Sequence, residues 1–174
     1  MVIVRILVRR GRRTDARQFI SLVRALADFE HLDPPSKEGK TRLIDDIFRK
    51  KKVNLLVASD GRRLVGYALY FYTYSSFLAK PSLYLEDLFI LEKYRKLGVG
   101  FSLFRRCVEI ALEEGCGRME WAVLTWNAKA LRFYEKLGAR RMADWYVYRL
   151  DEKALGRVPR TLQRGAVRPQ KSLR

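Results

Sequence analysis

The sequence predicts one α/β domain in which a central mixed β-sheet carries helices on both faces. Three observations predict it: the length of 174 residues, strand-like and helix-like segments interspersed along the chain, and a glycine turn that joins an apolar strand to an apolar-periodic helix. This length suffices for one sizeable core and is too short for two ordinary domains. We therefore expect one domain over residues 1–152 and a basic, flexible tail over residues 153–174, where arginines and prolines stand without periodicity.

Apolar periodicity places each element of this fold. Thr14-Asp15 offers an N-cap to the first stretch in which apolar residues recur every three or four positions. Asp60-Gly61 separates two apolar runs, as a hairpin turn does. The expected elements are strands over residues 2–8, 53–59, 64–74, 83–90, 119–124 and 145–150, the last within a β-hairpin around residues 140–150, and helices from Asp15 to about residue 30, over 41–50, from the glycine turn to Glu114 and over 128–137.

The expected strand over residues 64–74 is unusually aromatic. Its large rings belong to Tyr67, Tyr70, Phe71, Tyr72 and Tyr74. A central strand buried on both faces accounts for them better than an aromatic ligand cage does.

Lysine and arginine outnumber the acids by 36 to 19, and the formal net charge is +17. Such a charge attracts nucleic acid and ribosomes, but the arginines are spread over both ends of the chain rather than set on one reading element. Contact with nucleic acid or ribosomes is thus a secondary expectation. The cysteines, Cys107 and Cys116, make no disulfide framework or metal spacing. With His31 as the single histidine, we expect neither a zinc site nor a Ser-His-Asp triad.

No apolar run approaches the length that spans a membrane, and the first ten residues alternate as a strand does, without a cleavage region. We therefore expect a cytoplasmic protein that does not use a membrane.

One stretch combines a strand, a glycine turn and a helix. Leu83–Ile90 reads as an apolar strand, and Arg95–Ser102 contains the turn that opens the next helix. Glycines at 98 and 100 remove two Cβ atoms, so backbone N–H groups can approach a ligand at the positive end of that helix. The pattern is typical of a pyrophosphate site, although a plain tight turn has the same spacing.

Two segments in a fixed order resemble the signatures of the GNAT family of N-acetyltransferases. Leu83–Ser102 resembles its acyl-CoA motif, and Trp126–Ala139 resembles its second signature, N-x-x-A-x-x-F-Y-x-x-x-G-F/A. Over about residues 1 to 152 the chain is similar to the spermidine/spermine branch of that family. The segments that carry this finer similarity are Ala27–Glu30, Phe71–Tyr74 and Leu83–Asp87.

The resemblance implies how acetyl-CoA is bound, and it requires no metal. The main chain of Leu88, Phe89 and Ile90 holds the pantetheine arm, where the strand around 118–124 splays away from the strand over 83–90. The other implied contacts are Arg95, Lys96, Leu97, Gly98, Val99, Gly100, Phe101 and Ser102 around the pyrophosphate, and Asn127, Lys129, Ala130 and Tyr134 in the second signature.

Two side chains are candidates for the chemistry. Glu86 interrupts an apolar strand, where an unpaired carboxylate is costly, and it is either a general base or one half of an ion pair. Regular alternation puts Glu86 on one face with Tyr84 and Leu88 and puts Asp87 on the other, so the two acids should not share a role. Tyr134 is either packed beside its neighbour or a general acid, since a phenol stays protonated at neutral pH. The resemblance favours both catalytic roles.

The acceptor residues that the resemblance implies are Phe29, Glu30, Glu86, Glu120, Trp121, Ala122 and Asp144. Phe29 replaces a tyrosine of the branch, and acids are sparse around Asp144, so the acceptor stays open between a polyamine and a lysine-like amino acid such as thialysine. A protein N-terminus or lysine, for instance on a ribosomal protein, is the alternative acceptor. A CoA-binding protein that contacts nucleic acid or ribosomes without catalysis is the alternative of another class. The resemblance also implies a homodimer.

Overall fold

The computed structural model describes residues 6–164, and the chain divides into two compact units, residues 1–124 and 125–174. Residues 2–5 of the first expected strand and 165–174 of the expected tail lie outside the described residues.

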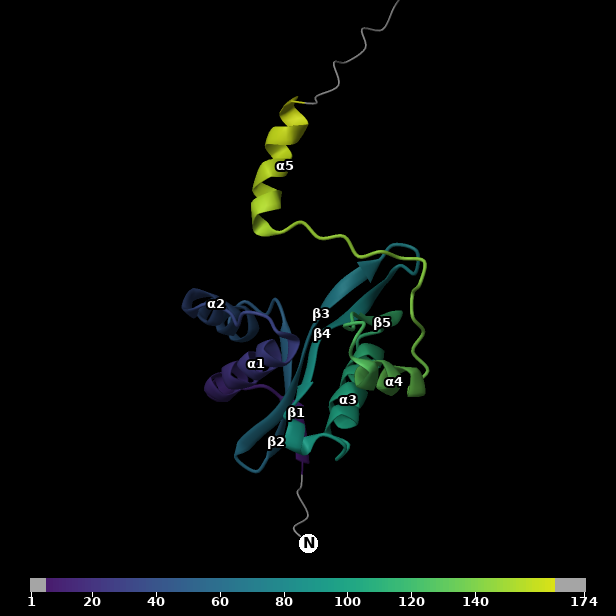
Figure 1. Cartoon of the computed structure of the whole chain (residues 1–174). Helices are drawn as coiled ribbons and strands as arrows, with labels where there is room; N and C mark the ends of the chain where they lie inside the picture. Colours follow the sequence, from purple (N-terminus) through teal and green to yellow (C-terminus); the bar gives the residue numbers. More distant parts are fainter. Residues whose placement is uncertain (1–5, 165–174) are drawn as a thin grey trace, which may run out of the picture. The chain divides into compact units, whose positions relative to one another are not determined.

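The first unit is built on a five-stranded sheet in the order β1-β2-β3-β4-β5 (Figure 1). The first four strands are antiparallel to their neighbours, whereas β4 and β5 run parallel. A parallel pair requires a crossover connection, and one helix, α3, supplies it. The strands are β1 (Ile6–Arg10), β2 (Asn54–Asp60), β3 (Arg63–Ser75), β4 (Lys80–Ile90) and β5 (Arg118–Trp121).

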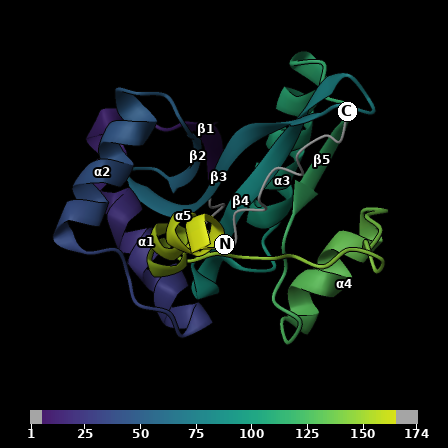
Figure 2. The same cartoon turned by 90° about the horizontal axis from the view of Figure 1, so that it is seen from above.

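Helices cover both faces of this sheet, which confirms the expected fold class (Figure 2). α1 (Ala16–Glu30) and α2 (Lys37–Phe48) lie on one face, and α3 (Val99–Glu113) lies on the other. α2 begins four residues before the expected position because the Ser36 hydroxyl accepts a bond from the Gly39 N–H at 3.1 Å and caps the helix. Short 3₁₀ turns, Arg13–Asp15 and Glu92–Tyr94, precede α1 and the glycine loop.

The aromatic strand β3 is buried on both faces along its first half. Tyr67 is fully buried on the face of α1 and α2, where its ring meets Phe19 edge-on at 5.0 Å. Tyr70, at 2% exposure, lies on the other face. This part of the interpretation is confirmed, but Tyr72 and Tyr74 are 40% and 68% exposed, so the far end of β3 is not buried on both faces.

Strand β4 carries one extra residue in the middle of its pairing with β3. Consecutive residues of β3, Leu69 and Tyr70, lie opposite Asp87 and Leu85. Glu86 therefore has no partner in the ladder, and it forms a β-bulge.

The bulge overturns the expected arrangement of the acids. Tyr84 lies opposite Phe71 and Asp87 lies opposite Leu69, and these two residues of β3 share a face. Tyr84 and Asp87 are therefore on the same face, not on opposite faces. Simple alternation failed because Glu86 shifts every later residue of β4 by one position.

Pairing between β4 and β5 is short. It joins Ser82–Leu85 to Arg118–Trp121 and ends at the bulge, and β5 stops three residues before the expected end. From Glu86 to Ile90, no strand of the described chain pairs with the β5 side of β4. The backbone polar groups of this segment that point to that side therefore have no strand partner.

The second unit contains two helices and no described strand. These are α4 (Ala128–Lys136) and α5 (Glu152–Arg164). The expected strand over residues 145–150, with its hairpin, is wrong, because this segment has no regular structure and Tyr146 and Val147 are 86% and 87% exposed. Without a neighbouring strand in its unit, an alternating segment cannot satisfy its backbone groups by pairing.

The part of the basic tail that the structure describes is helical, contrary to the expected lack of regular structure. The Asp151 carboxylate accepts a bond from the Ala154 N–H at 2.7 Å and so caps α5, whose first turn also carries Glu152. Pro159 lies inside this helix.

Candidate active site

The site within the first unit begins at the unpaired part of β4. The segment Leu88–Ile90 has no strand partner on its β5 side, which leaves room for the expected pantetheine contact. Glu86 is exposed at the bulge, where the ladder with β5 ends. An acyl-transfer site needs a backbone edge that can bind the thioester arm and an acidic side chain close to it. The roles of these residues stay predictions.

The glycine loop places an open helix N-terminus directly after this strand. Gly98 is the residue before α3, with φ of 77°, and a Cβ there would meet no atom within 4 Å. A Cβ on Gly100 would lie 3.2 Å from Ile90 Cδ1, so glycine permits the loop to lie against β4. The first N–H groups of α3 have no partner within the helix, so Gly98–Phe101 suit the pyrophosphate of acetyl-CoA.

Two expected anion ligands make bonds within the chain. The Arg95 Nε donates to the Ile90 carbonyl oxygen at 3.0 Å, and its guanidinium lies over the rings of Phe29 and Phe89, at 4.9 and 5.9 Å from their centroids. The Ser102 hydroxyl donates to the Gly98 carbonyl oxygen at 3.1 Å. Arg95 therefore ties the loop to β4 and to the end of α1, where the expected acceptor residues begin.

Three carboxylates gather on this part of the first unit. Asp87 and Glu86 are adjacent in β4, and Glu30 comes from the last turn of α1. Burial raises the pKa of the Asp87 carboxyl to about 6, the hydrogen bond from Tyr67 opposes that rise, and repulsion by Glu86 and Glu30 adds to it. Burial also raises the pKa of Glu30.

The carboxylate group has no basic partner within residues 6–164, although the whole chain carries 36 lysines and arginines. None of the salt bridges within the described part of the chain reaches Glu30, Glu86 or Asp87. Unpaired acids at the end of a half-open strand, in a strongly basic chain, suit a cationic ligand such as an alkyl ammonium.

Other expected acceptor residues are used differently. Glu120 is bound by Arg118, with 3.1 Å between Oε2 and Nε, and the Trp121 ring packs edge-on against Phe104 of α3 at 5.3 Å. Ala122 follows the end of β5. These residues lie on or beside the strand next to the carboxylates, while their acceptor roles stay predictions.

The second unit holds the remaining expected residues. Asn127 caps α4, since its Oδ1 accepts the Ala130 N–H at 3.1 Å, and Lys129 lies in the first turn. Tyr134 is half-buried in α4 with its ring 5.1 Å from that of Phe133. Asp144 is exposed outside any helix. Their roles toward acetyl-CoA and the acceptor stay predictions.

Sequence reasoning missed Tyr67 and gave Asp87 no role. The Tyr67 hydroxyl donates to Asp87 Oδ2 at 3.0 Å. The signal for this pair is the register of the β3–β4 hairpin, and the bulge hides that register from a count of alternating residues.

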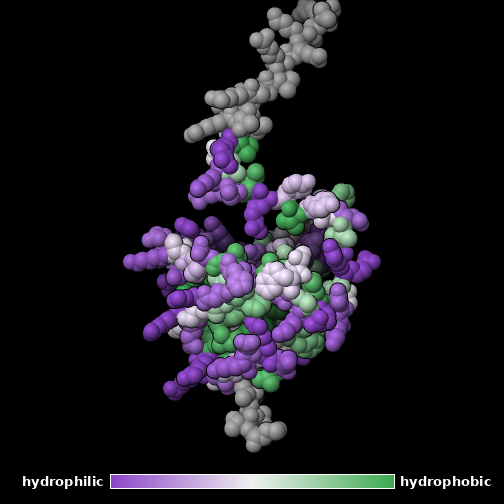
Figure 3. Space-filling view, in the orientation of Figure 1, coloured by the Kyte–Doolittle hydropathy of each residue, from purple (hydrophilic) through white to green (hydrophobic). Residues whose placement is uncertain are grey.

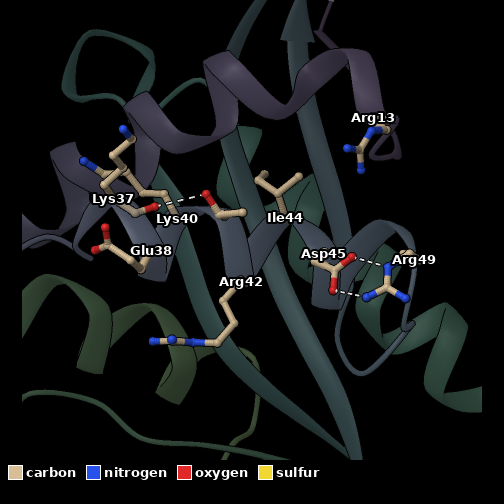
Figure 4. A pocket seen from close by; sticks show the side chains of 9 residues that line it. Arg13, Lys37, Glu38, Lys40, Arg42, Ile44, Asp45 and Arg49 are labelled. Carbon is tan, nitrogen blue, oxygen red and sulfur yellow. Dashed lines mark hydrogen bonds and ion pairs between the residues drawn. The ribbon is translucent and has the colours of Figure 1, made fainter.

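A hollow of about 730 Å³ lies elsewhere in the first unit, over α2 (Figure 4). Five of its lining side chains are cationic, and Arg49 binds Asp45 there. The cations are Arg13, Lys37, Lys40, Arg42 and Arg49. Such a lining repels an ammonium group, and it contains none of the expected site residues.

Residues 19–139 match the model of the acetyltransferase (GNAT) family. The match spans more than half of the chain, so the chain belongs to this family and is an acetyltransferase. It is similar to the thialysine N-epsilon-acetyltransferase of Mus musculus, with 32% identity over 160 residues that cover 85% of this chain and 94% of that protein.

Two further comparisons are with a human protein and with a solved structure. The spermidine/spermine N(1)-acetyltransferase-like protein 1 of Homo sapiens is 27% identical over 85% of this chain and 23% of that protein. The solved structure of an integron cassette protein from the mobile metagenome of V. cholerae has a TM-score of 0.75 at 19% identity, covering 88% of this chain and 97% of that chain, which shows a shared fold.

The family uses acetyl-CoA as co-substrate. Within residues 6–164, no three His, Cys, Asp or Glu side chains are grouped so as to hold a metal ion. No helix in the same range is long and apolar enough to cross a membrane.

Proposed function

We propose that this protein transfers the acetyl group of acetyl-CoA to a primary amine of a small molecule, either a lysine-like amino acid such as thialysine or a polyamine. The observation that carries this proposal is the group of three acids without a basic partner, beside the unpaired edge of β4 and the open N-terminus of α3. The names of the relatives in mouse and human support these two acceptor types. The alternative acceptor is a protein N-terminus or lysine.

Acetyl-CoA supplies an activated thioester, and the chain supplies proton transfer and binding. Glu86, through water, accepts the proton that the amine loses as its nitrogen bonds to the acetyl carbon. As the carbon–sulfur bond breaks, Tyr134 donates a proton to the departing thiolate. Backbone N–H groups of Leu88–Ile90 polarise the thioester carbonyl, and Lys96–Ser102 hold the pyrophosphate.

Acetyl-CoA turnover with thiol release tests this function over a panel of thialysine, lysine, spermidine, spermine and N-terminal peptides. We expect saturable turnover on thialysine or a polyamine, and we expect Tyr134→Phe and Glu86→Gln each to lower kcat by about 10²–10⁴-fold, the usual contribution of a proton-transfer group. Tyr146→Phe, at an exposed tyrosine of the same unit as Tyr134, is the control that should keep its activity.

The panel also decides between the alternatives. Turnover on peptides alone moves the acceptor to proteins. Tight CoA binding without turnover on any amine contradicts the proposal and favours a binding role. The expected homodimer and cytoplasmic location are separate parts of the proposal, and light scattering of the purified chain tests the first.

A further inference from the structure

The Tyr67 hydroxyl is fixed inside the core of the first unit. Tyr67 has 0% exposure, and its ring lies against Phe19 at 5.0 Å and Phe89 at 6.3 Å. Packing on these rings holds the hydroxyl in one place. The one hydrogen bond that it makes within the described residues is the donation to Asp87 Oδ2 at 3.0 Å.

Asp87 is held by one oxygen and open at the other. Its Oδ1 accepts no hydrogen bond within the described chain. Among the described residues, the side-chain oxygens that are both fully enclosed and without a hydrogen bond are Asp46 Oδ1 and Ser82 Oγ, so Asp87 Oδ1 is not fully enclosed. The second oxygen of Asp87 therefore keeps contact with solvent. It lies beside Glu86, the residue to which we assign the amine's proton.

We propose that Tyr67 is a positioning residue that keeps Asp87 anionic and turns its free oxygen toward the ammonium group of the acceptor. This inference rests on the proposed function, because it needs an amine acceptor. A neutral Asp87 would not attract the ammonium, and a hydrogen bond to the charged form of a carboxyl favours that form.

The charges around Asp87 make this bond consequential. Tyr67 comes from β3, Glu86 from β4 and Glu30 from α1, and both acids disfavour the charged form of Asp87. Arg95 stacks on Phe29 and Phe89 nearby, but it forms no ion pair with Asp87. The Tyr67 hydrogen bond is thus the described interaction that opposes protonation of Asp87, and burial raises the pKa of Tyr67 so that it remains a donor.

The test compares Tyr67→Phe with Tyr70→Phe across pH 5.5–9, on the amine that the wild type acetylates best. Tyr70 is the matched control, since it is a tyrosine of the same strand with 2% exposure and its described contacts do not include Asp87. For Tyr67→Phe we expect KM for the amine to rise by about threefold near pH 6.5 and by nearly tenfold at pH 5.5, with kcat nearly unchanged, because loss of one hydrogen bond should move the Asp87 titration up by about one pH unit. The rise should disappear by pH 8.5, where Asp87 is anionic in both proteins. The ratio of variant to wild type at each pH removes the amine's own titration.

Carboxyl ¹³C NMR of aspartate-labelled protein measures the titration of Asp87 directly. The Asp87 signal is assigned as the one that Asp87→Asn removes. It should titrate at a higher pH in Tyr67→Phe than in the wild type or Tyr70→Phe. In the Asp87→Asn background, Tyr67→Phe should change KM no further. This inference alone is overturned if the wild type acetylates amines but the ratio of KM in Tyr67→Phe to KM in the wild type does not depend on pH and the Asp87 titration does not move. If the wild type shows no turnover on any amine, the proposed function is overturned.

Discussion

At the residue scale, Asp15 shows how a single buried carboxyl organises a junction. It is 6% exposed between β1 and α1, and its two oxygens accept bonds from both terminal nitrogens of Arg9 at 2.7 and 2.9 Å. One oxygen also accepts the Arg12 N–H at 2.7 Å. The carboxylate thus joins a strand, a 3₁₀ turn and the start of a helix.

Asp15→Asn should lower the free energy of unfolding by roughly 2 kcal/mol at pH 7, because hydrogen bonds to charged groups contribute more than neutral ones. The bond from Arg9 holds the pKa of Asp15 below its usual value of 3.8. A lowered folded-state pKa gives stability that is present above about pH 4 and is lost as the pH falls through the lowered value. Urea unfolding at pH 7 and pH 2.5 should show the difference between wild type and variant shrinking.

Asp33→Asn removes the same charge from an exposed loop and serves as the control. If both variants unfold alike at pH 7, Asp15 is not the stabilising junction described above.

At the element scale, β3 and β4 approach each other so closely at Gly66 that a side chain would not fit there. A Cβ on Gly66 would lie 2.7 Å from the Phe89 carbonyl oxygen, a backbone atom that cannot rotate away. Gly66 lies opposite Ile90 in the ladder. The spacing of the two strands therefore depends on a missing side chain.

Gly66→Ala should destabilise the protein by about 1–3 kcal/mol through overpacking, and it should weaken CoA binding because it displaces Phe89 and Ile90. Thermal unfolding and calorimetric titration with CoA measure the two effects. Gly156→Ala is the matched control, since its Cβ would meet no atom within 4 Å and alanine favours a helix. Equal stability of both variants would show that the hairpin relaxes around the added methyl group.

The elements differ in how far the sequence predicts them. Strong periodicity predicted α1, α3, α4 and the first four strands, since each pattern matches one structural period. The bulge at Glu86 could not be predicted, because a bulge changes pairing without changing composition. The expected strand at 145–150 failed because alternation indicates a strand only where a partner exists, and α5 was missed because Pro159 and the arginines hid its cap at Asp151.

At the scale of the whole molecule, hydrophilic side chains are spread over the face seen in Figure 3 rather than gathered on one element. Arginines occur at both ends of the chain, so the net charge of +17 is not carried by one segment, and five of the cations line the hollow over α2. The field of such a charge binds polyanions without sequence preference.

We expect the protein to be retained on immobilised heparin at 50 mM salt and released by about 0.5 M, with the steep salt dependence of counterion release. Arg42→Glu in the hollow should lower the releasing salt concentration more than Arg132→Glu, which changes charge equally at an exposed position of α4. Identical elution would show that the hollow has no special share in the field.

The family signatures supply most residues of the candidate site, since they name residues by spacing, and the roles of these residues stay predictions. The signatures could not predict that Arg95 stacks on Phe29, because that contact joins segments distant in sequence. Asp87 was given no role for the same reason.

The bulge has a consequence for how this enzyme can change over generations. The ladder between β3 and β4 is complete without Glu86, because Leu85 and Asp87 already face consecutive residues of the opposite strand. Loss of one codon would therefore leave every pair of that ladder in place and remove only the acid. The proposed base is an insertion into a finished strand, so a lineage can gain or discard it in one genetic step while the scaffold is inherited intact.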